Sequence, residues 1–297
     1  MDITIGSRGS DLALWQAYFV RDELEALGHQ VKIEIIETRG DKIQHLSFDK
    51  IEGKGFFTKE IEDALLTKRI DIAVHSHKDL ETTPPTSLVI GAVSYRENPT
   101  DRLLIRKDKA DNSQFLSLPH HAIVGTSSAR RQTQIKRLCP TVGLKDLRGN
   151  VPTRIQKLRD GQYDAIILAS AGIKRLELDL SDLVEVELDP TVFVPAPAQG
   201  VLGLQIREDD SELAAVLSKL NHESVARAID VERSVLRNLE GGCQLPLGVY
   251  CTANEKGHDV YVSYAKDKTG VAYLKEYASV VDLDQIVSTI LDDLKAL

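Results

Sequence analysis

The chain of 297 residues has little cysteine, no excess of positive charge and no long apolar run. Three cysteines without a CxxC pair are too few and too scattered for a disulfide framework, and they suggest no zinc site. No apolar segment approaches the roughly 18 residues that a membrane-spanning helix needs. Because nucleic acids and anionic membranes attract broad cationic surfaces, the net charge of −8 argues against both as partners.

The composition that remains is typical of a soluble globular protein. Hydrophobic residues make up 42% of the chain and charged residues 28%, which does not indicate disorder. The first residues alternate like a strand and do not resemble a signal peptide. We therefore expect a cytoplasmic protein in a reducing compartment.

Strand and helix patterns alternate along most of the sequence. Strand patterns cover 2–7, 31–35 and 70–75, and the alternation of strand and helix returns between 122 and 176. This order predicts α/β sheets rich in parallel strands. After the stiff segment 194–197, the last part of the chain has the pattern of three short strands and an amphipathic helix, which predicts a separate small α+β domain.

Capping residues mark the ends of several predicted helices. Ser10 suits the N-cap of a helix that stops at Gly28, because its hydroxyl can accept a hydrogen bond from a free backbone N–H. Pro152 suits the first turn of a helix that stops at Gly161. Ser10 and Pro152 therefore place the turns 6–10 and 148–154 at the starts of helices.

Three strand-to-helix turns combine arginine with hydroxyl or amide side chains, at 6–10, 125–131 and 148–154. The free N–H groups of a helix N-terminus attract anions, and arginine adds a planar fork that matches a carboxylate or phosphate. A single turn of this kind is more often only a capped helix, but three of them favour a large polyanionic ligand. None contains the GxxxxGK[ST] loop, so nucleotide binding is not favoured.

One strand pattern leads directly into the segment 75–79. Lys78 can bind an anion, and Asp79 can act as an acid or base or stabilise a cation, although Asp is also a common turn residue. His75 and His77 share one face of an extended segment, but no third metal ligand is visible, so we expect no metal.

Two glycine-rich segments predict loops. Residues 39–57 show no periodicity and lead into GKGFFTK (53–59), which suits either a lid over an aromatic anion or an exposed loop with Phe57 in the core. Residues 240–246 place Cys243 on a tight, accessible loop, where its thiolate would be a strong nucleophile. A lone cysteine is, however, more often a small buried hydrophobe.

Nine short motifs occur in one order along nearly the whole chain. They are SRGSDLALWQ (7–16), TRGD (38–41), GKGFFTKE (53–60), DIAVHSHKD (71–79), GTSSARRQ (125–132), LRGNVPTR (147–154), YDAIILASAGIKRL (163–176), PAPAQG (195–200) and EGGCQLPLG (240–248). In this order they resemble the porphobilinogen deaminase family, also called hydroxymethylbilane synthases. One motif alone would be a weak indication, whereas nine in register are very specific.

The resemblance implies an α/β protein with three domains around a cleft. Two of them are periplasmic-binding-protein-like (type II) domains, and the third is a small C-terminal α+β domain. The implied boundaries are 1–97 with 197–218 for domain 1, 98–196 for domain 2 and 219–297 for domain 3, which carries the cofactor cysteine.

The resemblance also implies a reaction. Four porphobilinogen molecules are joined head to tail with release of ammonia, and water then releases hydroxymethylbilane, a step of haem biosynthesis. The family builds this chain on a dipyrromethane cofactor, attached by a thioether to a cysteine that matches Cys243 here. Asp79 matches the catalytic acid/base. A monomer that binds only its small-molecule substrate, without nucleic acid or membrane, is implied as well.

The binding residues carried over from the family are mostly cationic or hydroxylated, as the carboxylates of a pyrrole chain require. The cofactor-binding positions are Lys78, Thr126, Ser128, Arg130, Arg131, Arg148 and Arg154. The substrate-binding positions are Arg8, Ser10, Arg175 and Gln199. Lys54, Phe57 and Lys59 belong to the flexible loop. One departure is Gln205, which stands where an acidic residue is common in the family.

Two other functions stay open on the residues alone. A non-catalytic small-anion binding protein of the same two-lobed fold would explain the arginine-rich helix starts but not Cys243 on a glycine loop. A Cys–His acyl transferase that uses Cys243 with His75 or His77 would leave the basic residues unexplained.

Overall fold

The computed structural model describes residues 1–38, 58–239 and 245–297. These residues form two compact units. The first unit is Met1–Glu97 with Val201–Ala226, and the second is Asn98–Gly200 with Arg227–Leu297. The expected mobile loop at 39–57 lies outside the described residues, and so does the loop that carries Cys243.

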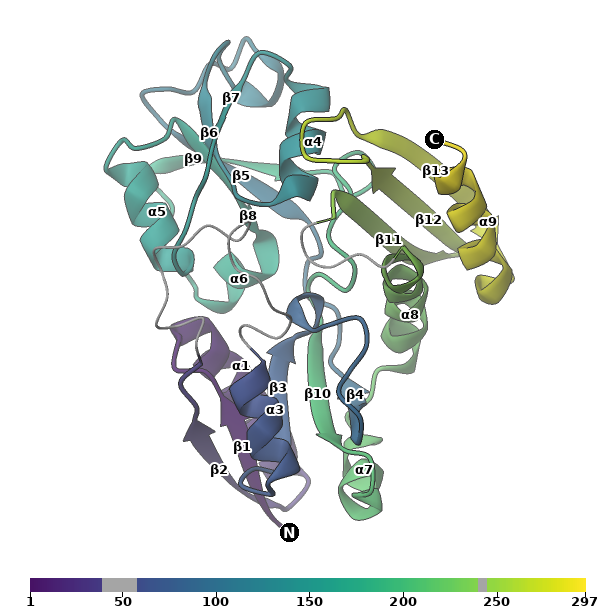
Figure 1. Cartoon of the computed structure of the whole chain (residues 1–297). Helices are drawn as coiled ribbons and strands as arrows, with labels where there is room; N and C mark the ends of the chain where they lie inside the picture. The colour runs from purple at the N-terminus through teal and green to yellow at the C-terminus, as the bar shows by residue number, and fades with distance from the viewer. Residues whose placement is uncertain (39–57, 240–244) are drawn as a thin grey trace. The chain divides into compact units, whose positions relative to one another are not determined.

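The first unit is built on a five-stranded sheet with the order β2-β1-β3-β10-β4 (Figure 1). Its strands are β1 (Asp2–Ser7), β2 (Gln30–Ile35), β3 (Ile72–Ser76), β4 (Leu88–Val93) and β10 (Leu202–Arg207). Its helices are α1 (Asp11–Ala26), α3 (Lys59–Leu66) and α7 (Ser211–Leu217). β1 is parallel to β2 and β3, whereas β10 is antiparallel to β3 and β4.

Helix α1 packs on this sheet through one apolar face. Ser10 is its N-cap, as expected, and the Ser10 hydroxyl accepts a hydrogen bond from Ala13 N at 3.4 Å. Val20 and Leu24 of the helix are buried in one cluster with Ile5 of β1. Burial of each such side chain contributes about 1.5–3 kcal/mol. This packing of α1 on the sheet therefore fixes the position where the turn from β1 ends and the helix begins.

The second unit contains a similar sheet with the order β7-β6-β8-β5-β9. Its strands are β5 (Asp101–Arg106), β6 (Ile123–Gly125), β7 (Gly143–Lys145), β8 (Ala165–Ala169) and β9 (Leu183–Leu188). Its helices are α4 (Ala129–Leu138), α5 (Val151–Arg159) and α6 (Ser170–Arg175). β6 is parallel to β7 and β8, whereas β5 is antiparallel to β8 and β9.

The C-terminal part of the second unit is a three-stranded antiparallel sheet with two helices. Its elements are α8 (Glu223–Asn238), β11 (Leu247–Asn254), β12 (Gly257–Tyr264), β13 (Tyr273–Val280) and α9 (Leu283–Lys295). Alternate residues of β12, Val260 and Val262, are buried with Val235 of α8 and Ile290 of α9 in one cluster. Both helices therefore cover the same face of this sheet.

The expected fold class is confirmed, since two α/β sheets precede a small C-terminal α+β part. The expectation of sheets rich in parallel strands was wrong, because each α/β sheet has as many antiparallel as parallel pairings. The antiparallel pairings come from β10 and β5. An apolar alternation predicts a strand but carries no sign of its direction.

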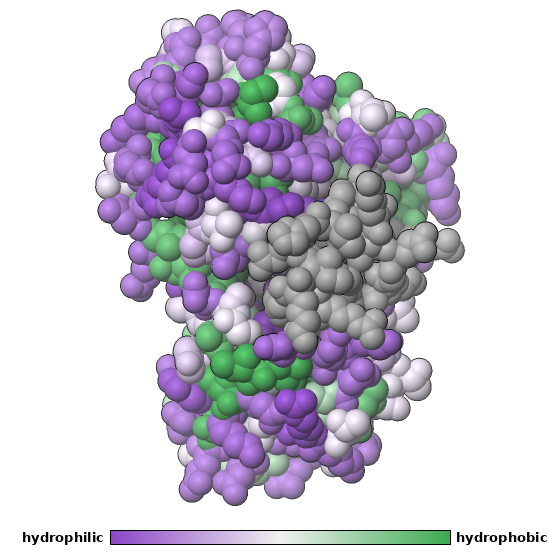
Figure 2. Space-filling view, turned by 60° about the vertical axis from the view of Figure 1, so that its left-hand side comes forward, coloured by the Kyte–Doolittle hydropathy of each residue, from purple (hydrophilic) through white to green (hydrophobic). Residues whose placement is uncertain are grey.

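The described surface is mixed in character. On the face shown in Figure 2, hydrophilic residues cover most of the area and hydrophobic residues form smaller patches between them. Within the described ranges, no helix combines the length and apolar character needed to cross a bilayer.

Strand β11 runs close to the connection that precedes β10. Val249 N donates a hydrogen bond to Pro195 O at 3.2 Å. A Cβ atom added at Gly248 would lie 2.5 Å from Val194 O, which is a backbone atom and cannot rotate away. Glycine is therefore required here by close approach of two backbones.

We predict that Gly248→Ala lowers the free energy of unfolding by about 1–3 kcal/mol, because the connection must shift to make room. Gly270→Ala is the matched control, since its added Cβ would meet nothing closer than 3.5 Å. Urea denaturation of both variants measures the difference. Equal stability of the two variants would contradict the proposed steric role.

Candidate active-site residues

Parallel pairing in the first sheet brings two predicted turns to one edge. β1 and β3 are parallel neighbours, so the chain leaves both strands on the same side of the sheet. The turn after β1 carries Arg8 and Ser10, and the turn after β3 carries Lys78 and Asp79. The predicted catalytic carboxylate therefore lies at the same sheet edge as side chains predicted to bind carboxylates.

A short 3₁₀ helix, η2 (His77–Asp79), fixes the backbone around the predicted catalytic residue. His77 N donates to Val201 O at 2.9 Å, and Leu80 N donates to His77 O at 3.2 Å. Leu80 is buried, whereas Asp79 is exposed. The carboxylate is thus presented outward from a backbone that its neighbours hold, which suits a group that must reach a ligand.

β3 enters this turn from a buried hydrogen-bond network. Gln16 Nε2 of α1 donates to Ser76 Oγ at 2.8 Å. His75 Nε2 and Gln205 Oε1 are 3.1 Å apart, and Gln205 Nε2 donates to Glu62 Oε1 of α3 at 3.1 Å. Because an amide oxygen only accepts, His75 carries its proton on Nε2.

His75 is neutral near pH 7. Burial lowers the pKa of His75 to about 4, the charge of Arg8 acts in the same direction, and the hydrogen bond to Gln205 opposes both. With its Nε2 proton engaged, His75 is unsuited to activate a cysteine, and His77 is buried as well. These features disfavour the Cys–His acyl transferase.

The second sheet brings a larger set of predicted residues to one edge. β6 is parallel to β7 and to β8, so the segments after all three strands leave the sheet on the same side. These segments carry Thr126, Ser128, Arg130, Arg131, Arg148, Arg154 and Arg175. Parallel topology alone therefore gathers the predicted cofactor-binding hydroxyls and arginines of this unit, together with Arg175.

Capping contacts shape the first of these turns. Ser128 is the N-cap of α4, and its hydroxyl accepts from Arg131 N at 3.5 Å. The Thr126 hydroxyl accepts from Ser128 N at 3.3 Å. Both hydroxyls use an acceptor lone pair in this way, so each keeps its O–H as a donor for an anion. The first N–H groups of α4 add to this donor character.

The turn before α5 orients the next two arginines. Gly149 has φ +113°, a conformation that requires glycine. Arg154 Nε donates to Gly149 O at 2.7 Å, and Lys157 Nζ donates to Arg148 O at 3.0 Å. Arg148 and Arg154 are both half-buried, so their guanidinium groups combine a fixed backbone with access to solvent.

Arg130 and Arg131 bind a carboxylate of the protein itself. Arg130 Nη1 donates to Asp101 Oδ2 at 2.7 Å, and Arg131 Nη2 donates to Asp101 Oδ1 at 2.7 Å. Burial raises the pKa of the Asp101 carboxyl, but the charges and hydrogen bonds of both arginines outweigh this effect and hold it below its usual range. The predicted ligands of an external anion are therefore paired with a buried Asp101.

Gln199 and Arg175, both predicted to bind substrate, tie the connection before β10 to the second sheet. Gln199 is fully buried, and its Nε2 donates to Pro99 O at 2.8 Å and to Asp101 Oδ1 at 3.0 Å. Arg175 Nη2 donates to Gly200 O at 2.8 Å. These contacts give both residues a structural role in the described chain.

Sequence reasoning missed Asp101 as part of this arrangement. The available signal was Asp101 itself, two residues before the apolar run 103–105, at the position where the structure begins a strand. β5 was not predicted, and Asp101 meets its arginines only because β5 is antiparallel to β8, with Asp101 opposite Ala169 at the end of β8.

The remaining predicted positions fall into two groups. Lys54, Phe57 and Cys243 lie outside the described residues. Lys59 is the exposed first residue of α3. The part of the chain that the structure describes contains no group of three His, Cys, Asp or Glu side chains suited to a metal ion.

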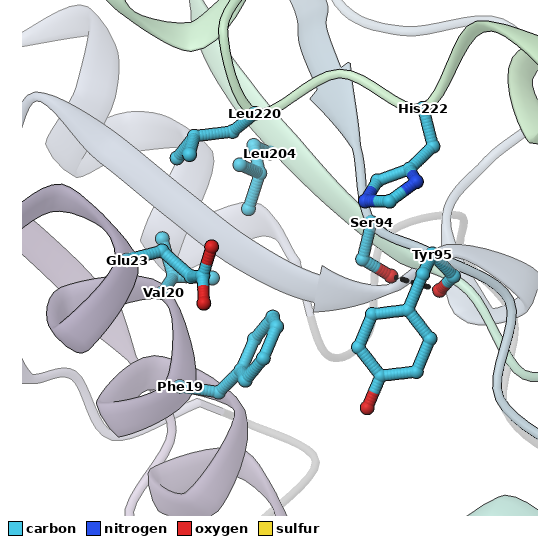
Figure 3. A pocket seen from close by; sticks show the side chains of 8 residues that line it. All are labelled: Phe19, Val20, Glu23, Ser94, Tyr95, Leu204, Leu220 and His222. Carbon is cyan, nitrogen blue, oxygen red and sulfur yellow. Dashed lines mark hydrogen bonds between the residues drawn. The ribbon is translucent and has the colours of Figure 1, made fainter. Parts of the chain in front are cut away.

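A small pocket in the first unit lies apart from these residues (Figure 3). Phe19, Val20, Leu204 and Leu220 give it a mostly apolar lining. Its lining includes the Glu23 carboxylate and no lysine or arginine. This pocket therefore does not suit a polycarboxylate, and none of the predicted site residues lines it.

The described residues define a protein of two mixed α/β sheets that gathers arginines and hydroxyls at strand ends, as an anionic ligand requires, with the exposed carboxylate of Asp79 at the edge of the first sheet. Family models agree with this class. Residues 3–215 match "Porphobilinogen deaminase, dipyromethane cofactor binding domain", and residues 226–291 match "Porphobilinogen deaminase, C-terminal domain". The chain belongs to the porphobilinogen deaminase family.

Curated relatives cover most of this chain. The porphobilinogen deaminase of Gloeobacter violaceus is 45% identical over 258 residues, which is 86% of this chain and 78% of that protein. That of Bacillus mycoides is 41% identical over 286 residues, which is 96% of this chain and 91% of that protein. A solved probable amino-acid ABC transporter extracellular-binding protein from Bacillus subtilis is 12% identical with a TM-score of 0.46, covering 74% of this chain and 90% of its own.

Family membership establishes the activity. The chain is an enzyme of tetrapyrrole biosynthesis with porphobilinogen deaminase (hydroxymethylbilane synthase) activity, and its substrate is porphobilinogen. Its first 215 residues include the domain that binds a dipyrromethane cofactor. The non-catalytic binding protein considered from the sequence is thereby excluded.

The buried His75 makes the stability of the protein depend on pH. Its pKa falls from 6.5 to about 4 on folding, so between these pH values the unfolded chain binds more protons than the folded one. We predict that the free energy of unfolding decreases by about 3 kcal/mol from this group as the pH falls from about 6.5 to about 4. Urea denaturation of the wild type and of His75→Asn across this pH range measures the effect.

His121→Asn is the matched control, because His121 is exposed and its positive φ of 63° is well tolerated by asparagine. The His75 variant should show a pH dependence smaller by about 3 kcal/mol over this range, and the His121 variant should keep that of the wild type. The same pH dependence in both variants would contradict the buried neutral state of His75.

Proposed function

We propose that the chain joins four porphobilinogen molecules head to tail on a dipyrromethane primer attached through a thioether to Cys243, with Asp79 as the catalytic acid/base, and that water then releases hydroxymethylbilane. The observation that supports the role of Asp79 most strongly is its position. It is an exposed carboxylate on a fixed 3₁₀ turn, at the same sheet edge as Arg8 and Ser10.

Asp79 has two tasks in this proposal. Its carboxylate accepts hydrogen bonds from pyrrole N–H groups, and its negative charge stabilises the cation left on the substrate when ammonia departs. Because the charge develops during the step, a fixed carboxylate lowers the barrier more than it stabilises the bound substrate. Arg8 and Ser10 would hold the acetate and propionate groups of porphobilinogen near this edge, and Lys78 would bind those of the cofactor.

The donor set of the second unit fits a dipyrromethane group. Each pyrrole ring carries two carboxylates, and the edge after β6 and β7 presents Thr126, Ser128, Arg130, Arg148 and Arg154 as hydroxyl and guanidinium donors. When bound, the cofactor supplies a permanent primer for the growing chain. Arg175 and Gln199 would support this edge through the connection before β10.

The two described cysteines are unsuited to carry the cofactor, which supports Cys243. Cys251 is 2% exposed, and its backbone N donates to Glu232 Oε1 at 2.8 Å. Burial raises the pKa of the Cys139 thiol, so little thiolate forms there. Neither described cysteine is disulfide-bonded.

We also propose three domains, with 1–97 and 197–218 in the first, 98–196 in the second and 219–297 in the third. The change of compact unit after Glu97 supports the first boundary, and the change after Gly200 lies four residues from the second, at 196. The protein would act in the cytoplasm as a monomer. The absence of a disulfide bond at Cys139 and Cys251 supports a reducing compartment.

We predict that Asp79→Asn keeps the fold and the covalent cofactor but forms hydroxymethylbilane at least ~100-fold more slowly, because the amide cannot stabilise the cation. Asp63→Asn, an exposed carboxylate change on α3, is the control and should retain normal turnover. Product formation and intact mass are measured on both proteins. Near-normal product formation by Asp79→Asn would refute the assigned role.

A further inference from the structure

A buried cluster of three charged side chains lies where α4 begins. Asp101 is 0% exposed, Arg130 4% and Arg131 7%. Two guanidinium groups meet one carboxylate, so the cluster carries one net positive charge. A buried charge without a counter-charge is strongly unfavourable, which indicates that this cluster is completed by an anion.

The two arginines are held in different ways. Arg131 donates from Nε and Nη2 to Asp101 Oδ1 and from Nη1 to Ile167 O, so all three of its nitrogens are engaged within the protein. Arg130 donates only from Nη1, to Asp101 Oδ2 and to Val194 O. Toward the other described residues, Nε and Nη2 of Arg130 make no hydrogen bond. Arg130 is therefore the arginine of this cluster whose positive charge can bind a further anion.

Asp101 is itself held firmly. Its Oδ1 accepts from Gln199 Nε2 at 3.0 Å in addition to Arg131, and Oδ2 accepts from Arg130. As the first residue of β5 it lies opposite Ala169, at the edge where β8 ends. This edge also carries Thr126 and Ser128, so the cluster sits among the donors proposed to bind the cofactor.

We propose that Asp101 is a positioning residue of the cofactor site. Asp101 neutralises Arg131, which serves as a support, and it holds Arg130 by one nitrogen so that the remaining positive charge binds a carboxylate of the dipyrromethane group. This proposal rests on the proposed function. A purely structural ion pair would need no net charge, whereas the proposed role requires the cluster to keep one positive charge.

Variants that change the net charge of the cluster distinguish a positioning role of Asp101 from a purely structural ion pair. Asp101→Asn leaves two buried cations without a carboxylate and should lower the melting temperature strongly. Arg131→Gln leaves a neutral Arg130–Asp101 pair, so it should fold but load the cofactor about tenfold less. The double variant Asp101→Asn with Arg131→Gln restores a single cation at Arg130. It should fold and load the cofactor at least threefold better than Arg131→Gln alone.

Cofactor loading, the fraction of protein that carries covalent pyrrole units, is measured directly and not through catalytic activity. Apoprotein from cells that make no porphobilinogen is incubated with porphobilinogen, and intact mass spectrometry gives the fraction that gains covalent pyrrole units. The melting temperature of each apoprotein is recorded alongside. Arg102→Gln is the control and should load like the wild type, because it removes a cation next to Asp101 that pairs with Glu185 and Glu187 at the surface.

Recovery of loading in the double variant, beyond what its melting temperature accounts for, supports the proposal. Loading that merely follows the melting temperature across all variants, or a stable double variant no better loaded than Arg131→Gln, overturns it. The comparison of these two variants holds even where Asp101→Asn alone does not fold. A wild type that gains no pyrrole mass overturns the proposed function as well, so the two failures are distinguishable.

Discussion

The buried ion cluster of Asp101 with Arg130 and Arg131 is the interaction on which the second unit depends. It joins the start of β5, the first turn of α4 and, through Gln199, the connection before β10. Removing any buried charge from water is costly, so such a cluster persists only when its hydrogen bonds are nearly complete. Here every nitrogen of Arg131 donates to the protein, whereas Arg130 donates from Nη1 alone, which leaves the cluster poised for an anion.

The first unit has a buried hydrogen-bond network, in contrast to this ion cluster, next to the turn that carries Asp79. His75, Gln205 and Glu62 form a buried chain in which the imidazole is neutral. The exposed carboxylate after β3 is Asp79, at an edge with Arg8 and Lys78. A net charge of −8 over the whole chain is therefore compatible with binding a polycarboxylate, because the cationic groups gather at strand ends.

Much of this arrangement follows from the sequence, and the rest depends on pairing between distant segments. Ser10 as an N-cap and Pro152 near the start of α5 are local features, and the structure confirms both. The antiparallel direction of β10 and the pairing of Asp101 with arginines 29 and 30 positions later have no local signal. Gln199 was predicted to bind substrate from its motif, and only the fold reveals its bond to Asp101.

The covalent attachment of the primer is the central claim of this account, and the intact mass of the purified protein tests it most directly. Active wild-type protein and the Cys139→Ser variant should both exceed the mass of the polypeptide by two linked pyrrole units, on the peptide that contains Cys243. Cys243→Ser should have the mass of the polypeptide alone. Catalytically competent wild-type protein with an unmodified mass would contradict the account.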